Sequence, residues 1–452
     1  MSYDKLLDKV YQFEKDNNLL NYEIDNIKIW QYLRATIFSE IYAQIAKNKQ
    51  TTLSFGSSIK QQTKAKDIFK VLVNSILFNP LFSFKIFKGV DDIFMLSSRK
   101  YLHNGNYEDI YLYDIYNKSK NKLMLDNGND INIFYKRIDW IIFAKLFLQK
   151  TFYRTNLNKK DLEYIIELEN KLKKVLGFKV ELKERFTKYL GVYKSLYLLN
   201  KVLFKLYRPK RCYLTASYGK APTIKVAKDL GIEVIEVQHG ILGKMHYGYY
   251  FPFDKNLDYF PSKFLVFGQY FKNLNYLPLS VDDIDIHHYS FLKAKKLEFN
   301  NEIQKNNLLI VSDAFVNGTS YLDFLVKNID FIKTFDKVYY KLHPQETKVG
   351  FYDKIPQMQR LVQLGNFELI QPEKHIYKYL SLSKHVITVR STVIYEALEF
   401  ACNVHVVKED GYEDMLDLKE YLSFVDLDEK ISFETKHKSE KRFFIDSLKT
   451  NG

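Results

Sequence analysis

The sequence has few residues that crosslink a chain or interrupt its elements: 2 cysteines, 9 prolines and 17 glycines among 452 residues. The two cysteines both lie in apolar, strand-like runs, so they do not form a disulfide framework and favour a reducing compartment. No apolar run reaches the length of about 18 residues that a membrane-spanning helix needs, and the first residues show no apolar core of a secretion signal. We therefore expect a cytoplasmic location, free or peripheral on the inner face of the plasma membrane.

Several common enzyme signatures are absent as well. The sequence contains no GxGxxG, no GxxxxGK[ST], no HExxH and no CxxC pattern. These patterns are typical of nicotinamide-dependent enzymes, P-loop kinases, zinc proteases and thiol redox proteins, respectively. Their absence argues against all four classes.

The chain is positively charged overall and longer than a typical single domain. It carries 68 Lys and Arg against 54 Asp and Glu, a net charge of +14, which favours phosphate-rich partners such as nucleotides, nucleic acid or an anionic membrane surface. A chain of 452 residues is long enough for two domains with a cleft between them.

The C-terminal third shows a regular alternation of strand-like and helix-like segments. Buried strands are predicted at 308–313, 337–344, 367–372, 385–389 and 403–408, and helices at 319–332, 375–383 and 391–400. Such alternation is typical of a parallel, doubly wound sheet that helices cover on both faces.

The middle of the chain repeats this pattern. Strands are predicted at 91–98, 131–137, 211–217, 232–240 and 263–268, and helices at 161–176, 182–207 and 219–231. We therefore predict an α/β protein with two Rossmann-like domains facing across a cleft. The domains are an N-terminal one at 91–290 and a C-terminal one at 291–452, after a helical segment at 1–90, with 277–296 as the crossing between them.

Polar residues follow three of the predicted strands, at the carboxyl edge where ligands bind in open sheets. Arg390, Ser391 and Thr392 stand where a strand ends and a helix begins, so free amides and the arginine would suit a phosphate. Glu396, just over one turn into that helix, would then reach a ribose hydroxyl. An ordinary helix cap with an exposed arginine, and a glutamate paired with a lysine, is the alternative.

A second group is Lys341, His343 and Pro344. The period of two along a strand places Lys341 and His343 on one face, where both can point toward one anion, and proline suits a strand end. The histidine would donate to a diphosphate or protonate a leaving phosphate oxygen. A histidine bonded to a loop carbonyl explains the motif equally well.

The third group is Gln238, His239 and Gly240, followed by Lys244 and His246 on the same loop. His239 can act as a base or as an electrostatic clamp, and Gly240 would allow a backbone conformation that brings a ligand close. Two histidines and a lysine beside a glycine indicate a site in the cleft.

The stretch 282–288 contains the pair Asp283 and Asp285 and two histidines that could ligate a divalent metal, or form a solvated linker. We predict no metal and no cofactor. Lys341, His343, Arg390 and a helix N-terminus would supply the positive charge that a metal otherwise gives a departing phosphate.

The order of these motifs resembles bacterial glycosyltransferases of the GT-B fold that build capsule and lipopolysaccharide. Within that group it is most similar to CMP-sugar users, the sialyl and Kdo transferases, and to the related CDP-glycerol glycerophosphotransferases. The resemblance covers about 212–407. It implies that His343, Ser391 and Thr392 hold the nucleotide phosphates of the donor, and that His239 takes part in catalysis.

The catalytic base is not assigned by the resemblance. Sialyltransferases take it from an acidic pair followed by glycine ahead of the HP motif, whereas here Glu409–Gly411 comes after it. We therefore take Asp109 as the acidic candidate, with Asp92, Glu108 and Asp114 nearby.

The expected function is transfer of a sugar from a nucleotide-activated donor, a CMP-sugar being favoured, to a surface polysaccharide or lipid-linked glycan. Alternatives are transfer of a polyol phosphate from a CDP-polyol, epimerisation of a nucleotide sugar, and a non-catalytic basic scaffold. Nucleic acid is not expected as the partner, because a scaffold gives no reason for three polar strand ends to converge.

Two stretches suit a membrane surface. The segment 66–89 is rich in Phe, Leu and Ile and edged by lysines, and 183–211 carries nine basic residues against one acidic residue. They either lie at an anionic membrane interface or are ordinary amphipathic helices with one face in the core.

Overall fold

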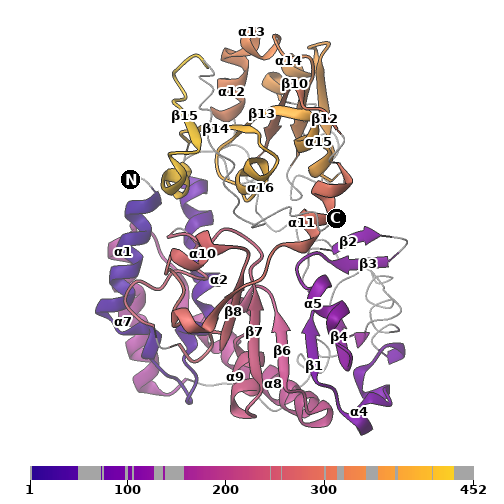
Figure 1. Ribbon diagram of the computed structural model, residues 1–452. Coiled ribbons are helices and arrows are strands. Elements are labelled where there is room, and N and C mark those ends of the chain that lie inside the picture. Colours follow the sequence, from indigo (N-terminus) through magenta and orange to yellow (C-terminus); the bar gives the residue numbers. More distant parts are fainter. Residues whose placement is uncertain are drawn as a thin grey trace.

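Two parallel β-sheets form the framework of the protein (Figure 1). The computed structural model describes residues 3–48, 73, 76–96, 100–103, 106–126, 136–137, 157–244, 246–255, 257–299, 302–312, 320–342, 355–371, 375–409 and 411–431. The first sheet contains β1 (Asp92–Met95), β4 (Lys122–Asp126), β5 (Lys136–Arg137), β6 (Arg211–Leu214), β7 (Glu233–Val237), β8 (Lys263–Val266) and β9 (Ile284–Ile286). The second contains β10 (Lys305–Val311), β11 (Val338–Lys341), β12 (Phe367–Ile370), β13 (Ser383–Thr388), β14 (Asn403–Val407) and β15 (Leu422–Val425).

Both sheets have the doubly wound strand order. The first runs β5-β4-β1-β6-β7-β8-β9 and the second β12-β11-β10-β13-β14-β15, with every neighbouring pair parallel. In each sheet the order reverses once, between β1 and β6 and between β10 and β13. Such a reversal opens a crevice at the carboxyl ends of the two strands. The prediction of two Rossmann-like domains is confirmed.

Helices cover both faces of each sheet. Those of the first domain are α5 (Tyr113–Lys118), α7 (Lys159–Leu176), α8 (Leu182–Tyr207), α9 (Ala221–Asp229) and α10 (Gln269–Asn273); those of the second are α12 (Ser320–Lys327), α13 (Ile329–Ile332), α14 (Pro356–Val362), α15 (Tyr377–Leu382) and α16 (Val393–Glu399). Their ends follow local chemistry. Asn158 accepts a hydrogen bond from the amide of Asp161 at the start of α7, and Gly177, at φ 80°, ends that helix.

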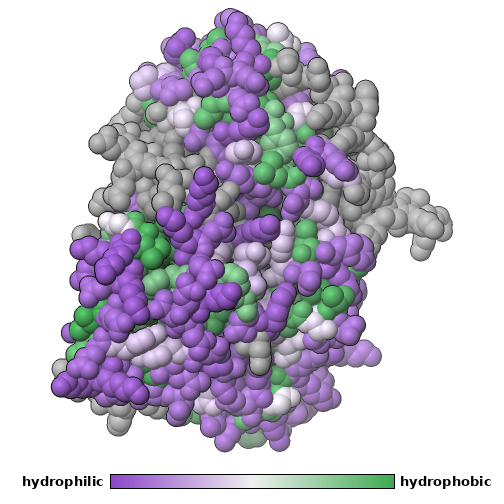
Figure 2. Space-filling model, turned by 90° about the vertical axis from the view of Figure 1, so that its left-hand side faces the viewer, coloured by the Kyte–Doolittle hydropathy of each residue, from purple (hydrophilic) through white to green (hydrophobic). Residues whose placement is uncertain are grey.

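The helices α1 (Tyr3–Asp16) and α2 (Ile29–Asn48) pack on the first domain. They contact α7 and α8, and Trp30, Ile37 and Phe38 are buried in the core that also holds Phe94 and Val237 of the first sheet. The N-terminal segment is therefore helical where it is described, and it completes the core of the first domain. The surface on the side of α1 and α7 is mainly hydrophilic (Figure 2).

The crossing between the domains differs from the prediction. Residues 284–286, predicted as part of the linker, form the edge strand β9, and α11 (Ser290–Glu298) follows in the remainder of the predicted crossing. The strands β4 and β15 and the hairpin of β2 (Lys100–His103) and β3 (Asn106–Asp109) were also not predicted. The predicted strand at 131–137 is described only at β5.

Two buried histidines make the second domain sensitive to acid. His385 Nδ1 lies 3.2 Å from His405 Nε2, between neighbouring strands, and burial lowers the pKa of His385 to about 4 and that of His405 to about 3. In the unfolded chain both titrate near pH 6.5, so as the pH falls below 6.5 the unfolded state binds more protons and stability is lost.

We expect the free energy of unfolding to fall by roughly 6 kcal/mol between pH 7 and pH 4 through this pair, with each histidine contributing about half. Urea denaturation at several pH values measures how steeply the free energy of unfolding falls with decreasing pH. In the His405→Leu variant this pH dependence should be weaker. An unchanged slope in that variant would contradict the assignment.

Candidate functional site

The carboxyl ends of the two sheets are turned toward each other across the domain interface (Figure 1). An aromatic contact and a hydrogen bond join the domains beside these ends: the rings of Phe271 and Tyr395 lie 5.2 Å apart, and Tyr276 donates to Asp417 at 3.1 Å. Arg390 follows β13, at the switch point of the second sheet, and His239 follows β7, next to the switch-point strand β6. This is the GT-B-like architecture expected from the sequence.

His239 is oriented by a hydrogen-bonded chain. Its Nδ1 lies 2.9 Å from the hydroxyl of Tyr249, and that hydroxyl donates to Oε1 of Glu236. Because the hydroxyl has one proton and gives it to the carboxylate, we assign the proton of His239 to Nδ1. Nε2, which lies 3.4 Å from the hydroxyl of Tyr218, is then the atom that can accept a proton.

Glu236 is fully buried in β7 at the end of this chain. Burial raises the pKa of its carboxyl to about 6, although hydrogen bonds from Ser217 and Tyr249 and the charge of Lys220 act in the opposite direction. The carboxylate is therefore ionised near neutral pH. In that state it stabilises positive charge that develops on His239, since the intervening hydroxyl couples the two groups.

His246 lies on the other side of Tyr249 and is close to the second domain. The rings of His246 and Tyr249 stack at 4.5 Å, and burial, with the nearby charges of Arg390 and Arg34, lowers the pKa of His246 to about 4. Its Nδ1 is buried and has no hydrogen-bond partner within the described residues. His246 is thus a neutral imidazole with an unused polar atom at the domain interface.

Arg390 supplies positive charge from the second domain. Its Nη1 lies 3.9 Å from Oδ2 of Asp414. It also packs over Gly411, where a Cβ would lie 2.9 Å from Nη1 and the φ of 96° favours glycine. On the first domain, a Cβ on Gly243 would lie 3.3 Å from Oδ1 of Asp414. The loop that carries His239 and His246 therefore meets the loops that carry Arg390 and Asp414.

The N-terminal helices hold the loop after β7 in place. Tyr11 of α1 donates to the carbonyl of Lys244 at 3.0 Å. Arg34 of α2 donates to the carbonyls of Tyr247 and Tyr250, the latter at 3.1 Å, while its guanidinium forms a buried ion pair with Glu14 at 2.6 Å. This brace fixes the backbone on either side of Tyr249.

Close packing of Tyr218 completes this wall. A Cβ on Gly248 would lie 2.4 Å from a ring carbon of Tyr218, so only glycine leaves room for the ring. Beside it, a cavity of about 30 Å³ is lined by residues that include Arg34, Tyr218, Tyr247 and Gly248. This volume suffices for ordered water.

Several predicted site residues have other partners in the structure. Gln238 is buried and donates to the carbonyl of Gly240 at 2.9 Å while it accepts from the amide of Phe267 at 2.8 Å. Lys341 is buried and donates to the carbonyls of Leu342 and Gln371 at 3.2 and 3.0 Å. Both side chains stabilise strand ends, and the role of Lys341 as an anion ligand stays a prediction that requires these bonds to be exchanged.

The two acidic site candidates, Asp109 and Glu396, also have hydrogen-bond partners within the protein. Asp109 is buried, and its Oδ1 accepts from the amides of Tyr111 and Leu112 at 2.9 Å, which is the role of a turn cap. Glu396 accepts a hydrogen bond from the hydroxyl of Tyr377 at 3.0 Å. A base at Asp109 and a ribose contact at Glu396 stay predictions, each requiring these bonds to be exchanged.

Gly240 has a φ outside the left-handed region, and a Cβ there would meet no atom of the protein within 4 Å. That this glycine lets a ligand come close stays a prediction. The position is open rather than strained. Lys244 is exposed, and only its backbone carbonyl takes part in the brace.

At the start of the seven-residue helix α16, Ser391 Oγ accepts from the amide of Val393 at 3.2 Å, while the N-cap residue Thr392 makes no side-chain cap hydrogen bond. Ser391 and Thr392 are partly exposed beside Arg390. His343 and Pro344 lie outside the described residues, and their predicted part in donor binding stays a prediction.

Residues that the sequence did not single out form much of the site: Glu236, Tyr249, Tyr218 and Arg34. One signal was present, because Glu236 is a charged residue inside an otherwise apolar predicted strand, and buried charges are commonly functional. The other three take their places through tertiary packing.

The acidic stretch at 282–288 does not converge on one point. Asp285 pairs with Lys263 at 3.2 Å, His287 faces Asp114 at 3.9 Å, and His288 lies 3.3 Å from the carbonyl of Phe267. In the part of the chain that the structure describes, no group of three His, Cys, Asp or Glu side chains could hold a metal ion.

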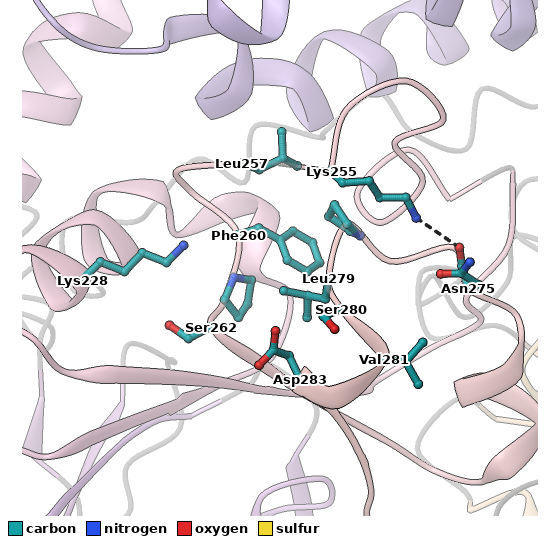
Figure 3. Close-up of a pocket in the computed structure, with 12 residues that line it drawn as sticks. Lys228, Lys255, Leu257, Phe260, Ser262, Asn275, Leu279, Ser280, Val281 and Asp283 are labelled. Carbon is teal, nitrogen blue, oxygen red and sulfur yellow. Dashed lines mark hydrogen bonds between the residues drawn. The ribbon is translucent and has the colours of Figure 1, made fainter.

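A separate pocket of about 660 Å³ lies at the other edge of the first sheet (Figure 3). Its lining includes Ser262 and Asp283, which precede β8 and β9, so it opens at the amino ends of the strands. Lys228 and Lys255 extend along its sides, and Lys255 donates to the carbonyl of Asn275 at 3.4 Å. Its position separates it from His239 and Arg390.

No protein-family model matches the sequence, and no curated protein matches it. Among solved structures, the chain is similar to the UDP-GlcNAc 2-epimerase of Methanocaldococcus jannaschii, at 13% identity over 75% of this chain and 89% of that one, with a TM-score of 0.43. A second UDP-N-acetylglucosamine 2-epimerase is 12% identical over 75% of this chain and 84% of that one, with a TM-score of 0.44. A glycosyltransferase from Rickettsia africae is 10% identical over 75% of this chain and 85% of that one, with a TM-score of 0.38. Likenesses this distant say nothing of substrate or reaction.

Proposed function

We propose that the protein is a glycosyltransferase that moves a sugar from a nucleotide-activated donor, a CMP-sugar being favoured, to a surface polysaccharide or lipid-linked glycan. The observation that carries the proposal is the meeting of two sets of loops: the loop that carries His239, oriented by Tyr249 and Glu236, contacts the loops of the second domain that carry Arg390 and Asp414. Proton acceptance and phosphate binding are the two tasks of sugar transfer, and the two domains supply one each.

His239 serves the acceptor. Its Nε2 takes the proton of the attacking hydroxyl while the hydroxyl oxygen forms a bond to the anomeric carbon of the donor sugar. Glu236 stabilises the resulting imidazolium through Tyr249, because the carboxylate is ionised above pH 6. His246, held neutral by burial, offers its unpartnered Nδ1 to the donor or the acceptor.

Arg390 serves the donor. As the bond between the anomeric carbon and the phosphate oxygen breaks, its electron pair stays on the nucleotide phosphate, and a guanidinium beside that oxygen stabilises the negative charge. Ser391 and Thr392 lie next in the chain, where their hydroxyls can bind the same phosphate. The motif resemblance assigns His343 to this group as well.

Thermal unfolding of the full chain with CMP, CDP, UDP or GDP tests the donor side. A nucleotide that binds only the native state raises the melting temperature, and at 100 times its Kd the gain is about 2.7 kcal/mol. We expect stabilisation by CMP, lost in Arg390→Gln and kept in Arg360→Gln, a control that removes an exposed arginine of α14 in the same domain.

Product analysis separates the related reactions. A sugar transferase releases CMP and joins the sugar to an acceptor, a polyol-phosphate transferase moves a phosphate with its polyol, and an epimerase forms product without any acceptor. A wild-type chain that none of the four nucleotides stabilises, and that releases no nucleotide from any activated sugar with or without acceptors, would refute the proposal.

A further inference from the structure

The segment 76–88 exposes large apolar side chains in unusual density. Ile76, Leu77, Phe82, Phe84 and Phe87 are 60, 65, 69, 89 and 81% exposed, respectively. Exposed apolar residues are normal when they are scattered, whereas a contiguous group of this kind marks a surface that contacts a partner or a membrane.

Hydrogen bonds fix the backbone of this segment so that these side chains stay outside. Asn79 caps the short helix at Pro80–Phe82 by accepting from the amide of Leu81 at 2.8 Å, and Tyr207 of α8 donates to the carbonyl of Pro80. Arg208 donates to the carbonyl of Phe87 at 3.3 Å. The exposure therefore belongs to an anchored element, α4 (Lys85–Lys88) and the turn before it.

Cations surround the apolar group. Lys88 lies within the segment and is exposed, whereas the ammonium of Lys85 donates to the carbonyl of Lys122; the end of α8, which contacts α4, adds the exposed Lys205 and Arg208. Phenylalanines interleaved with lysines match a bilayer interface, where rings enter the acyl boundary and ammonium groups meet phosphates. Each cation near an anionic surface strengthens binding about fivefold.

The position of the segment leaves it free to meet a flat surface. Figure 1 shows α4 at the foot of the first domain, at the amino end of β1 and away from the second domain. The side formed by α1 and α7 is mainly hydrophilic by comparison (Figure 2). No helix in the described ranges is long and apolar enough to cross a membrane.

We propose that residues 76–88 dock the protein on a bilayer of anionic phospholipids, with Phe82, Phe84 and Phe87 inserted into the interface and Lys88, Lys205 and Arg208 on the headgroups. His239 lies at the carboxyl edge of the same sheet, so docking holds the candidate site above the bilayer by about the length of a strand, roughly 15 Å. The inference stands on exposure and charge, independently of the reaction.

Co-sedimentation of the full chain with vesicles tests the proposal. We expect binding to vesicles of phosphatidylcholine and phosphatidylglycerol in a 7:3 ratio, weak binding to pure phosphatidylcholine, and weakening in high salt because the charge component is screened. Combined Phe82→Ser, Phe84→Ser and Phe87→Ser should weaken binding about a thousandfold, since burying each of the three rings contributes about a factor of ten. Lys88→Gln with Lys205→Gln should reduce the preference for anionic vesicles.

The control removes exposed apolar side chains elsewhere, with Ile303→Ser and Val362→Ser, at 79 and 52% exposure in the wild type. This variant should bind vesicles like the wild type. If the triple variant does not fold, Phe84→Trp gives a second measurement, a blue shift and quenching by brominated lipid on vesicle addition. The proposal would be overturned if the wild-type protein bound neither kind of vesicle. It would also be overturned if the protein formed a concentration-dependent dimer that the triple serine variant abolishes.

Discussion

Replacing His239 with alanine should lower the turnover of sugar transfer by roughly 10²–10⁴-fold, the range that a positioned general base contributes. The donor should still bind, because Arg390 and the end of β13 are unchanged, so nucleotide stabilisation of the fold separates lost chemistry from lost binding. Steady-state transfer assays with the same variant give the turnover. Wild-type turnover in a folded His239→Ala chain would remove His239 from the mechanism.

The Tyr249→Phe variant tests the hydrogen-bonded chain that connects His239 to Glu236. The variant removes the hydroxyl between His239 and Glu236, so kcat should fall while KM for the donor stays near the wild-type value. Tyr197→Phe is the matched control, since that hydroxyl also donates to a carboxylate, Asp229 at 2.7 Å, but lies on the exposed face of α8. It should leave both constants unchanged.

The hydrogen-bonded chain of His239, Tyr249 and Glu236 also sets the pH dependence of turnover. Glu236 has a pKa of about 6, so its charge is present at pH 7 and is lost as the pH falls through 6. Wild-type turnover should therefore fall on the acid side near pH 6, because protonated Glu236 no longer stabilises the imidazolium of His239. A flat profile from pH 7 to pH 5 would contradict this coupling.

The sequence predicted the two sheets because their strands are buried on both faces. Leu308 to Val311 in β10 and Val386 to Thr388 in β13 form continuous apolar or β-branched runs between helical segments, a pattern that survives in a single sequence. The strand β9 was missed because it is an edge strand in which Asp285 faces solvent, so its composition resembled a linker.

The site was predictable where it depends on strand ends and unpredictable where it depends on loops that fold back. His239 and Arg390 follow apolar strands, and parallel topology brings such ends to one edge. Tyr249 reaches Glu236 only because the loop after β7 returns over the strand, and Arg34 reaches that loop from more than two hundred residues away. No local pattern encodes either contact.

Arg34→Met should be the most damaging substitution for the fold of the site. Arg34 and Glu14 are both buried, and removing one partner of a buried ion pair costs roughly 3–5 kcal/mol because the other charge is left unpaired. Urea denaturation followed by tryptophan fluorescence measures this loss, since Trp30 donates to Glu14 at 2.6 Å in the same cluster.

The double variant Arg34→Met with Glu14→Gln separates the charge from the brace. Glutamine removes the unpaired charge and keeps an acceptor for Trp30, so stability should recover in part. Turnover should not recover, because the carbonyls of Tyr247 and Tyr250 still lack their donor and the loop that holds Tyr249 and His246 stays loose. Equal recovery of both quantities would show that Arg34 acts through stability alone, and a single variant as stable as the wild type would show that the brace does not support the loop.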